Sequence, residues 1–375
     1  MIILTLPDLQ QIPNQPIYFH NSTKRRSEDA LIAYTWGYFM NDTKNNAEYL
    51  ARLPMTKAVV RAMDAIQEFV NTLNPNIPRV YDFLIAGGSK RGWTTWTTAA
   101  VDKRVKIIVP IVMPIVGMHD IIDEMYRVYG EWSFALEDYI EEKVLKYFGK
   151  PEFKELEKIV DPLTYIKRYT MIKYVVVAAG DEFFLPDSTK FFWDKLVGPS
   201  FLRVLPNAEH TTIGSSISAL LSAETLLQRY ANKRPLPQFD FKLTYGNETA
   251  RIVARTSGPF RPTVVKKWWA TTLSSEKRDF RLLTCKSPLC VNLVWWKSEI
   301  ISESSPGSGV YMAIQEKPES GWTGFMIEAT YNFNYTDSST LNPIQEFKVT
   351  TSVNVVPDIL PFQSCIVTDS CQPDA

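Results

Sequence analysis

The sequence lacks both an excess of charge and a long apolar run. Its 41 basic residues balance 41 acidic ones over 375 positions, so no overall field attracts nucleic acid or anionic lipid. No segment approaches the roughly 20 unbroken apolar residues that cross a bilayer, and the apolar opening, residues 1–7, is too short for the core of a signal peptide. We therefore expect no nucleic-acid partner, no membrane span and no signal peptide in this chain.

Cysteine and histidine are also scarce. The four cysteines fall as two short-range pairs, Cys285 with Cys290 and Cys365 with Cys371. A zinc site needs Cys-x-x-Cys spacing or neighbouring histidines, and the three histidines all precede the cysteines by a long stretch of chain. Local disulfides are the prediction, with unpaired thiols as the alternative. We expect no metal and no cofactor.

Four Asn-x-Ser/Thr acceptor sites for N-glycosylation occur, against about two expected by chance. They lie at Asn21, Asn41, Asn247 and Asn334. Together with the expected disulfides, these sites favour a secreted, extracellular protein.

The middle of the chain alternates short apolar runs with helical segments, which is typical of a mostly parallel sheet covered by helices. The expected strands are residues 80–86, 105–113, 174–179 and 201–205. The expected helices are residues 28–40, 54–71, 94–101, 188–196 and 217–229. No strand pattern precedes the first helices, and four strands make a thin sheet. We therefore expect N-terminal strands of the sheet to be missing from this chain.

Two further regions differ from this pattern. Residues 118–170 are too many for an ordinary connection between strands and have helical periodicity, which predicts a cap insertion. After a Pro-rich linker at 233–237 the sequence becomes rich in Thr, Val and aromatic residues with alternating polarity, which predicts an antiparallel β-sandwich-like domain. We place the first domain at residues 1–232 and the β-rich C-terminal domain at residues 233–375.

The expected strands of the C-terminal domain are residues 239–245, 264–273, 291–297, 324–333 and 346–356. Two of them carry tryptophan pairs, Trp268–Trp269 and Trp295–Trp296. Successive strand residues point to opposite faces, so we expect one ring of each pair to face outward.

Ser89 lies in a glycine-rich turn between an expected strand and an expected helix. The strand at 80–86 is followed directly by Gly87-Gly88-Ser89-Lys90-Arg91-Gly92. A nucleophilic serine at such a turn needs small neighbours, because the backbone is strained and close-packed, and the helix N-terminus helps to bind an oxyanion. The usual Gly-x-Ser-x-Gly spacing is not met, since glycine comes third after the serine. The alternative is a serine that only caps the helix.

An acid and a base follow the next two strands, in the chain order Ser, Asp, His that α/β-hydrolases use. Asp181 comes after the strand at 174–179 and His210 after the strand at 201–205. Both lie where the carboxyl ends of parallel strands assemble sites. We therefore predict Ser89, Asp181 and His210 as catalytic residues.

Other residues compete for these roles. His20 lies in a polar segment and His119 opens the cap, so neither has the position of the base. Glu182 and Asp187 are rival acids, although we expect Asp187 to cap the helix that starts at residue 188.

The serine has basic and aromatic neighbours. Lys90 and Arg91 have two possible roles. In a functional role they bind a substrate carboxylate or assist the oxyanion. In a structural role they pair with Asp102 and glutamate side chains as ordinary surface charges. Trp93 and Trp96 are three residues apart on one helix, and we expect them in the core.

Several long runs resemble one known family, the PhoPQ-activated pathogenicity-related proteins of bacteria and the related autocrine proliferation repressor proteins of amoebae. These runs are RRSEDALIAYTW (25–36), LPMTKAVVRAMDA (53–65), GGSKRGWTTWTTAAVDKRV (87–105), GDEFFLPDS (180–188), LPNAEH (205–210) and GWTGFMIEATY (321–331). The resemblance implies an α/β fold: an α/β-hydrolase-like, mostly parallel sheet with a helical cap, followed by a β-rich domain. It also implies an exported protein whose relatives begin well before the stretch matching residues 13–19.

Two functions are consistent with these features. The first is a secreted serine hydrolase, either an esterase or a peptidase, that uses Ser89, Asp181 and His210 on an unknown substrate. The second is a secreted signalling protein that keeps the hydrolase scaffold and acts by binding a cell-surface receptor, with outward aromatic rings such as Trp268 or Trp295 as the contact.

Overall fold

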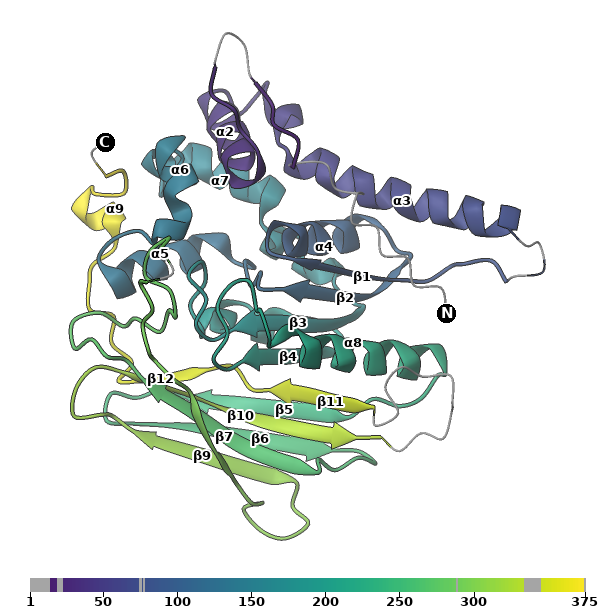
Figure 1. Ribbon diagram of the computed structural model, residues 1–375, viewed down its shortest axis with the longest axis vertical. Helices are drawn as coiled ribbons and strands as arrows, with labels where there is room; N and C mark the ends of the chain where they lie inside the picture. The colour runs from purple at the N-terminus through teal and green to yellow at the C-terminus, as the bar shows by residue number, and fades with distance from the viewer. Residues whose placement is uncertain are drawn as a thin grey trace.

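The computed structural model describes residues 14–18, 23–73, 76, 78–287, 289–333 and 345–373. One sheet runs through the molecule, with strand order β1-β2-β3-β4-β11-β10-β7-β8 and β12 paired to β10 (Figure 1). Its first four strands are parallel. They are β1 (Phe83–Gly88), β2 (Val105–Ile111), β3 (Ile172–Ala178) and β4 (Ser200–Leu205). The predicted mostly parallel sheet is confirmed.

Helices cover these parallel strands. Helix α4 (Lys90–Val101) packs on β1 and β2 and against the long helix α3 (Arg52–Leu73), and α8 (Ser216–Ala231) packs on β11. The strands are rich in valine and isoleucine because covered parallel strands are apolar on both faces. All residues of β3 after the first are buried, which fits this arrangement.

A layer of helices lies beside the carboxyl ends of the parallel strands (Figure 1). It consists of α2 (Glu28–Asn41), α5 (Met118–Tyr129), α6 (Glu137–Glu141) and α7 (Pro151–Val160). Short 3-10 turns connect the larger elements: η1 (Ala47–Tyr49), η2 (Phe134–Leu136), η3 (Leu145–Tyr147), η4 (Pro162–Arg168), η5 (Ser188–Phe191) and η6 (Trp193–Lys195). The apolar faces of these helices share one buried cluster, which includes Trp36, Phe148 and Phe153.

The C-terminal strands extend the same sheet in antiparallel fashion. Strand β11 (Glu346–Thr350) pairs with β4 where Thr350 faces Leu202. The remaining strands of this sheet are β10 (Thr323–Asn332), β7 (Val264–Thr271), β8 (Lys297–Ile300) and β12 (Asn354–Val356). The main sheet is therefore continuous across the expected domain boundary after residue 232, and that boundary stays a prediction.

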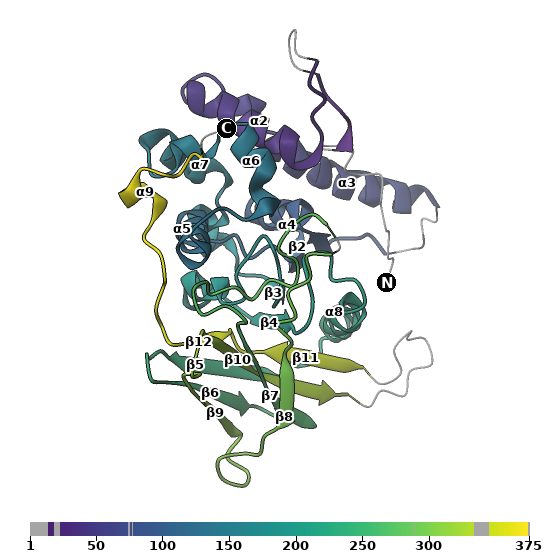
Figure 2. The ribbon, with the colours of Figure 1, turned by 60° about the vertical axis from the view of Figure 1, so that its left-hand side comes forward.

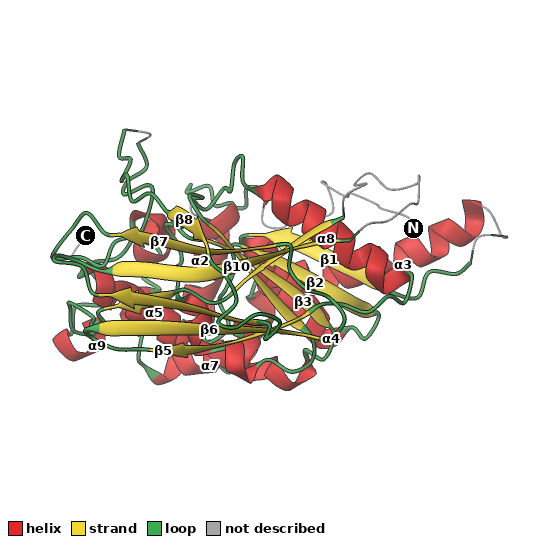
Figure 3. Cartoon of the chain, turned by 90° about the horizontal axis from the view of Figure 1, so that it is seen from below, coloured by secondary structure: helices red, strands yellow, loops and turns green. Residues whose placement is uncertain are grey.

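A second, smaller sheet packs against this antiparallel half. It consists of β5 (Gln238–Thr244), β6 (Thr249–Ser257) and β9 (Val310–Glu316). Ile252 and Ala313 of the small sheet share a buried core with Ile327 of the large one. In the view from below, strands lie in front of most of the cap helices (Figure 3). The predicted fold class is confirmed: an α/β-hydrolase-like sheet with a helical cap, followed by a β-sandwich-like arrangement.

Three local expectations were wrong. Residues 188–196 form the turns η5 and η6 instead of one helix. Most of residues 291–297 form no strand, and the backbone of Trp296 instead exchanges hydrogen bonds with the Asn207 side chain at 2.7 and 3.0 Å. Trp268 and Trp269 are both half-buried, since cores cover β7 on both faces.

The other two aromatic expectations hold. Trp295 is 59% exposed and Trp296 is 1% exposed, so one ring of that pair faces outward. Trp93 and Trp96 are buried, as expected for core residues.

Both cysteine pairs form disulfides, Cys285–Cys290 and Cys365–Cys371. Two of the four glycosylation acceptors, Asn41 and Asn247, are exposed. The other two, Asn21 and Asn334, lie outside the described residues.

After β12 the chain crosses back to the cap helices, where it packs against α5 and α6 (Figure 2). We call residues 358–373, including helix α9 (Cys365–Thr368), the strap. Its Cys371 carbonyl accepts a hydrogen bond from Trp132 Nε1 at 2.7 Å, and its Phe362 N–H donates to the Arg127 carbonyl at 3.0 Å. The disulfide of the strap lies against the buried cluster of the cap.

A buried cluster of four charges joins the cap to the C-terminal half. Arg278 donates to Asp187 at 2.7 Å and to Glu124 of α5 at 2.8 Å, and Lys190 binds both carboxylates. Burial alone would raise the pKa of Asp187, but the charges of Arg278 and Lys190 outweigh it and hold the pKa at about 2. Asp187 does not cap a helix, because its carboxylate is held by these cations.

We predict that Asp187→Asn lowers the free energy of unfolding by about 3 to 5 kcal/mol, because it leaves buried cations undercompensated. The contribution of Asp187 is complete above its ordinary pKa of 3.8 and is lost as pH falls toward 2. Urea unfolding at neutral pH measures the loss. Glu248→Gln, which breaks the exposed pair with Lys317, is the control and is expected to change stability by less than about 1 kcal/mol. Equal effects of the two changes would contradict the prediction.

Candidate active site

Ser89 lies in the sharp turn between β1 and α4. Its backbone has φ 52° and ψ −129°, a conformation that residues with a side chain rarely adopt. The Ser89 N–H donates to the Ile111 carbonyl of β2 at 2.9 Å, which fixes the turn to the sheet. The Ser89 side chain makes no capping hydrogen bond to α4. Ser89 thus occupies the N-cap position of α4 without capping the helix through its side chain, and its Oγ contacts His210 instead.

Two glycines allow this turn. A Cβ on Gly87 would lie 2.4 Å from the Arg91 carbonyl oxygen, and a Cβ on Gly92 would lie 2.9 Å from the Gly87 carbonyl oxygen and 2.9 Å from Met113 Cβ. A Cβ on Gly88 would meet no atom within 4 Å. The glycine that follows the serine stands three positions after it, at residue 92, because this residue of α4 faces the strands and has no room for a side chain.

The three predicted catalytic side chains form one hydrogen-bonded chain. His210 Nε2 lies 2.8 Å from Ser89 Oγ. His210 Nδ1 lies 2.9 Å from each carboxylate oxygen of Asp181. Asp181 is buried and also accepts from the Phe183 N–H at 2.7 Å, which orients its carboxylate toward the histidine.

The loops that carry Asp181 and His210 are fixed to each other. Gly180 N–H donates to the Ala208 carbonyl at 2.9 Å, and Leu282 N–H of the C-terminal half donates to the Gly180 carbonyl at 2.9 Å. Leu282 therefore holds the Asp181 loop directly, and Trp296 holds the His210 loop through Asn207.

The pKa of His210 is raised above its ordinary value of 6.5. Burial disfavours the charged imidazolium, but the charge and hydrogen bond of Asp181 outweigh burial. Burial, followed by the charge of Asp181, raises the pKa of Glu182. Glu182 accepts from the His210 backbone N–H at 3.1 Å and does not contact the imidazole by hydrogen bond. Of the three candidate acids, only Asp181 binds the histidine ring.

Lys90 and Arg91 are occupied by acidic residues of α2. Lys90 Nζ lies 2.8 Å from Asp29 and 3.1 Å from Glu28, and Arg91 lies 3.0 Å from Glu28. The expected partner Asp102 binds Arg104 instead. A role of Lys90 and Arg91 in substrate binding stays a prediction.

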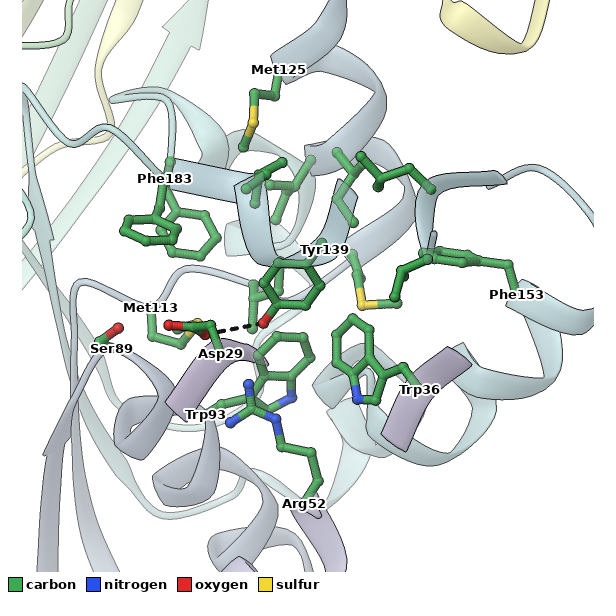
Figure 4. Close-up of a pocket in the computed structure, with 18 residues that line it drawn as sticks. Asp29, Trp36, Arg52, Ser89, Trp93, Met113, Met125, Tyr139, Phe153 and Phe183 are labelled. Carbon is green, nitrogen blue, oxygen red and sulfur yellow. Dashed lines mark hydrogen bonds between the residues drawn. The ribbon is translucent and has the colours of Figure 1, made fainter. Parts of the chain in front are cut away.

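A cavity of about 60 Å³ opens beside Ser89, under the cap. Most of its walls are apolar, and Figure 4 shows Met113, Met125, Phe153 and Phe183 around it. Its polar lining groups besides Ser89 are Asp29, Arg52 and Tyr139, and the Tyr139 hydroxyl donates to Asp29 at 3.2 Å (Figure 4).

Residues 4–281 match the family model of the PhoPQ-activated pathogenicity-related protein. The chain belongs to this family. Over 369 residues it is 43% identical to autocrine proliferation repressor protein A of Dictyostelium discoideum, covering 97% of this chain and 73% of that protein. The PhoPQ-related chain thus matches both groups that its sequence runs resemble.

Among solved structures, two hydrolases are similar to part of this PhoPQ-related chain. Acetyl xylan esterase 1 of Thermoanaerobacterium has 17% identity and a TM-score of 0.31, with 51% of this chain and 54% of that one covered. The 2,6-dihydroxy-pseudo-oxynicotine hydrolase has 15% identity and a TM-score of 0.31, with 47% of each chain covered. The chain spans about half the length of these two proteins.

The site also contains residues that sequence reasoning missed. Asp29, Arg52 and Tyr139 come from helices outside the strand pattern, so no spacing signal pointed to them. Asp29 and Arg52 lie in or beside the runs that resemble the family, at 25–36 and 53–65, and this was the signal available. His119 binds Glu157 of α7, and His20 lies outside the described residues.

Two kinds of feature are absent from the described residues. No helix in this part of the PhoPQ-related chain is both long and apolar enough to cross a membrane. No group of three or more His, Cys, Asp or Glu side chains in it is arranged to hold a metal ion.

We predict that Gly92→Ala lowers the unfolding temperature, because the added methyl group overpacks the contact of α4 with β1 and β2 at a cost of about 1 to 3 kcal/mol. Gly88→Ala is the matched control and should be close to neutral, because its Cβ meets open space. Thermal melting followed by circular dichroism measures both proteins. If Gly88→Ala were the more harmful change, the account of the turn would be wrong.

Proposed function

We propose that this PhoPQ-related protein is a secreted serine hydrolase, an esterase or peptidase, with Ser89 as nucleophile, His210 as base and Asp181 as orienting acid. The observation that carries the proposal is the chain of contacts from Ser89 Oγ through both ring nitrogens of His210 to Asp181, at 2.8 and 2.9 Å. The strained backbone at Ser89 and the adjacent cavity support it.

In this mechanism His210 Nε2 takes the proton of Ser89 Oγ as that oxygen attacks the substrate carbonyl carbon. The carbonyl oxygen becomes an oxyanion, which the backbone N–H groups after Ser89, at the free N-terminus of α4, stabilise. His210 then gives the proton to the leaving group as the carbon–heteroatom bond breaks. Water, deprotonated by His210, cleaves the resulting acyl-serine ester and releases the acid.

Secretion is part of the proposal. Two disulfides are expected to persist in an oxidising compartment, and the exposed acceptors Asn41 and Asn247 suit glycosylation in the secretory route. The name of the amoebal relative, an autocrine repressor, also fits an extracellular protein.

We predict that a fluorophosphonate probe labels the folded protein and that Ser89→Ala abolishes both the labelling and the turnover of a short-chain aryl ester. The measurement is in-gel labelling together with ester hydrolysis. Ser298→Ala, at an exposed position of β8, is the control and should label like the wild type. Undiminished labelling of the Ser89→Ala protein would sink the proposed nucleophile.

The pH profile gives a second prediction. The base must be neutral, and its pKa is raised, so kcat/KM should rise with pH through a midpoint above 6.5. Asp181→Asn removes the charge that raises the pKa, so the midpoint should move to lower pH while the maximal rate falls by about 10²- to 10⁴-fold. Glu182→Gln, which keeps an amide oxygen for the His210 N–H, should shift the midpoint less. A midpoint that Asp181→Asn leaves in place would argue against this assignment.

A second candidate function is receptor binding on the same scaffold. The relative that is 43% identical over most of the chain carries the name of a proliferation repressor. Trp295 offers an exposed ring next to Trp296, whose backbone N–H donates to the Asn207 side chain in the loop that carries His210. The Ser89→Ala protein separates the two functions in a cell-growth assay. Repression that survives Ser89→Ala but is reduced by Trp295→Ala would favour binding, and the reverse pattern would favour hydrolysis.

A further inference from the structure

Arg52, the first residue of α3, is a buried cation without an ion pair. It is 2% exposed and lines the same cavity as Ser89. Among the described residues no carboxylate forms an ion pair with it, whereas four of the other five buried arginines each bind one, and the fifth, Arg229, binds the Pro235 carbonyl. These pairs are Arg26–Glu142, Arg203–Glu328, Arg278–Asp187 and Arg281–Asp279.

The contacts of Arg52 satisfy only part of its guanidinium. Its Nη1 donates to the Lys90 carbonyl at 2.7 Å, and its central carbon lies 4.1 Å from the centre of the Trp93 ring. Its Nε is buried and has no hydrogen-bond partner within the described part of the chain. Figure 4 shows the guanidinium on the side of the cavity where Asp29 and the Tyr139 hydroxyl lie.

The neighbouring charges do not neutralise Arg52. Lys90 and Arg91 are already matched by Glu28 and Asp29, two cations against two anions. Burial lowers the pKa of Arg52 to about 10, and the nearby Tyr139 and Asp29 offset this only in part. The anionic side chain that lines the cavity, Asp29, already binds Lys90 at 2.8 Å, so Arg52 has no ion-pair partner of its own there among the described residues.

An uncompensated buried charge is costly, and buried polar atoms without partners are rare in folded proteins. An anionic ligand in the cavity would supply the partner that Arg52 lacks. The rest of the cavity requires that ligand to be largely apolar, because its wall is formed by side chains such as Met113, Ile121 and Phe184.

We propose that Arg52 determines specificity by binding a carboxylate that the substrate carries on a short apolar stem. This inference rests on the proposed function, because it assigns a substrate class to the Ser89 site. The reacting carbonyl lies at Ser89, the apolar stem fills the cavity and the carboxylate meets the guanidinium. Lys90 and Arg91 are then free to keep their pairing with α2.

The first test measures binding without turnover. In Ser89→Ala protein, the monomethyl ester of pentanedioic acid should bind at least about 10-fold more tightly than methyl pentanoate, which lacks the carboxylate. Adding Arg52→Met should remove that preference and leave methyl pentanoate unaffected, whereas Arg52→Lys should retain part of it. Titration calorimetry gives the affinities. Equal affinities for the two esters, or a preference that survives Arg52→Met, would overturn the inference.

The same titration identifies the source of the carboxylate. An acetylated dipeptide of apolar residues is compared with its C-terminal amide. A preference for the free acid that depends on Arg52 assigns the carboxylate to a peptide end, whereas a preference confined to the pentanedioate ester assigns it to a diacid. Absence of both preferences overturns the proposal.

A second readout separates a binding role from a structural one. Arg52→Met should raise the unfolding temperature, because it removes an uncompensated cation, and Arg61→Met on the exposed side of α3 should leave it nearly unchanged. A structural role for Arg52 predicts the opposite, a lower temperature. If the wild type hydrolyses no ester, the proposed function fails, while the binding result in Ser89→Ala still decides the role of Arg52.

Discussion

The close contact of α4 with β1 and β2 is the constraint on which the site depends. Because Gly87 and Gly92 have no side chains, the first turn of α4 can pack directly on the strands. This close packing requires the backbone at Ser89 to adopt a rarely populated conformation. That turn directs Oγ to His210 and opens onto the cavity under the cap. The strain at Ser89 is held by the packing of the surrounding sheet, which supplies the stability that the turn itself lacks.

The C-terminal half is part of the site's framework and not a separate appendage. Leu282 and Trp296 hold the loops of Asp181 and His210. Arg278 of the same region connects to the cap through the buried carboxylates of Glu124 and Asp187. The parallel and antiparallel strands share one sheet. The positions of Asp181, His210 and the cap therefore all depend on segments that follow them by many residues in the chain.

The sequence predicted the parts of the site that follow strands. Ser89, Asp181 and His210 each come directly after a buried apolar run, and such runs can be recognised without the fold. Arg52 and Tyr139 could not be predicted, because they reach the cavity through the packing of helices far apart in sequence. Asp187 illustrates the opposite error: its local pattern is that of a helix cap, but a distant arginine, Arg278, determines its role. Trp296 is similar, since its strand pattern is overridden by a side chain from another loop.

The strap gives the cap an unusual dependence on the order of synthesis. Its contacts with the cap join residues separated by 232 to 244 positions. The α5 and α6 region therefore cannot complete its core until the strap, residues 358–373, has left the ribosome. A chain that ends before the strap contains Ser89, Asp181 and His210 but lacks the contacts that cover the cap cluster. Interrupted products of translation would therefore expose the apolar cap cluster, which quality control can recognise.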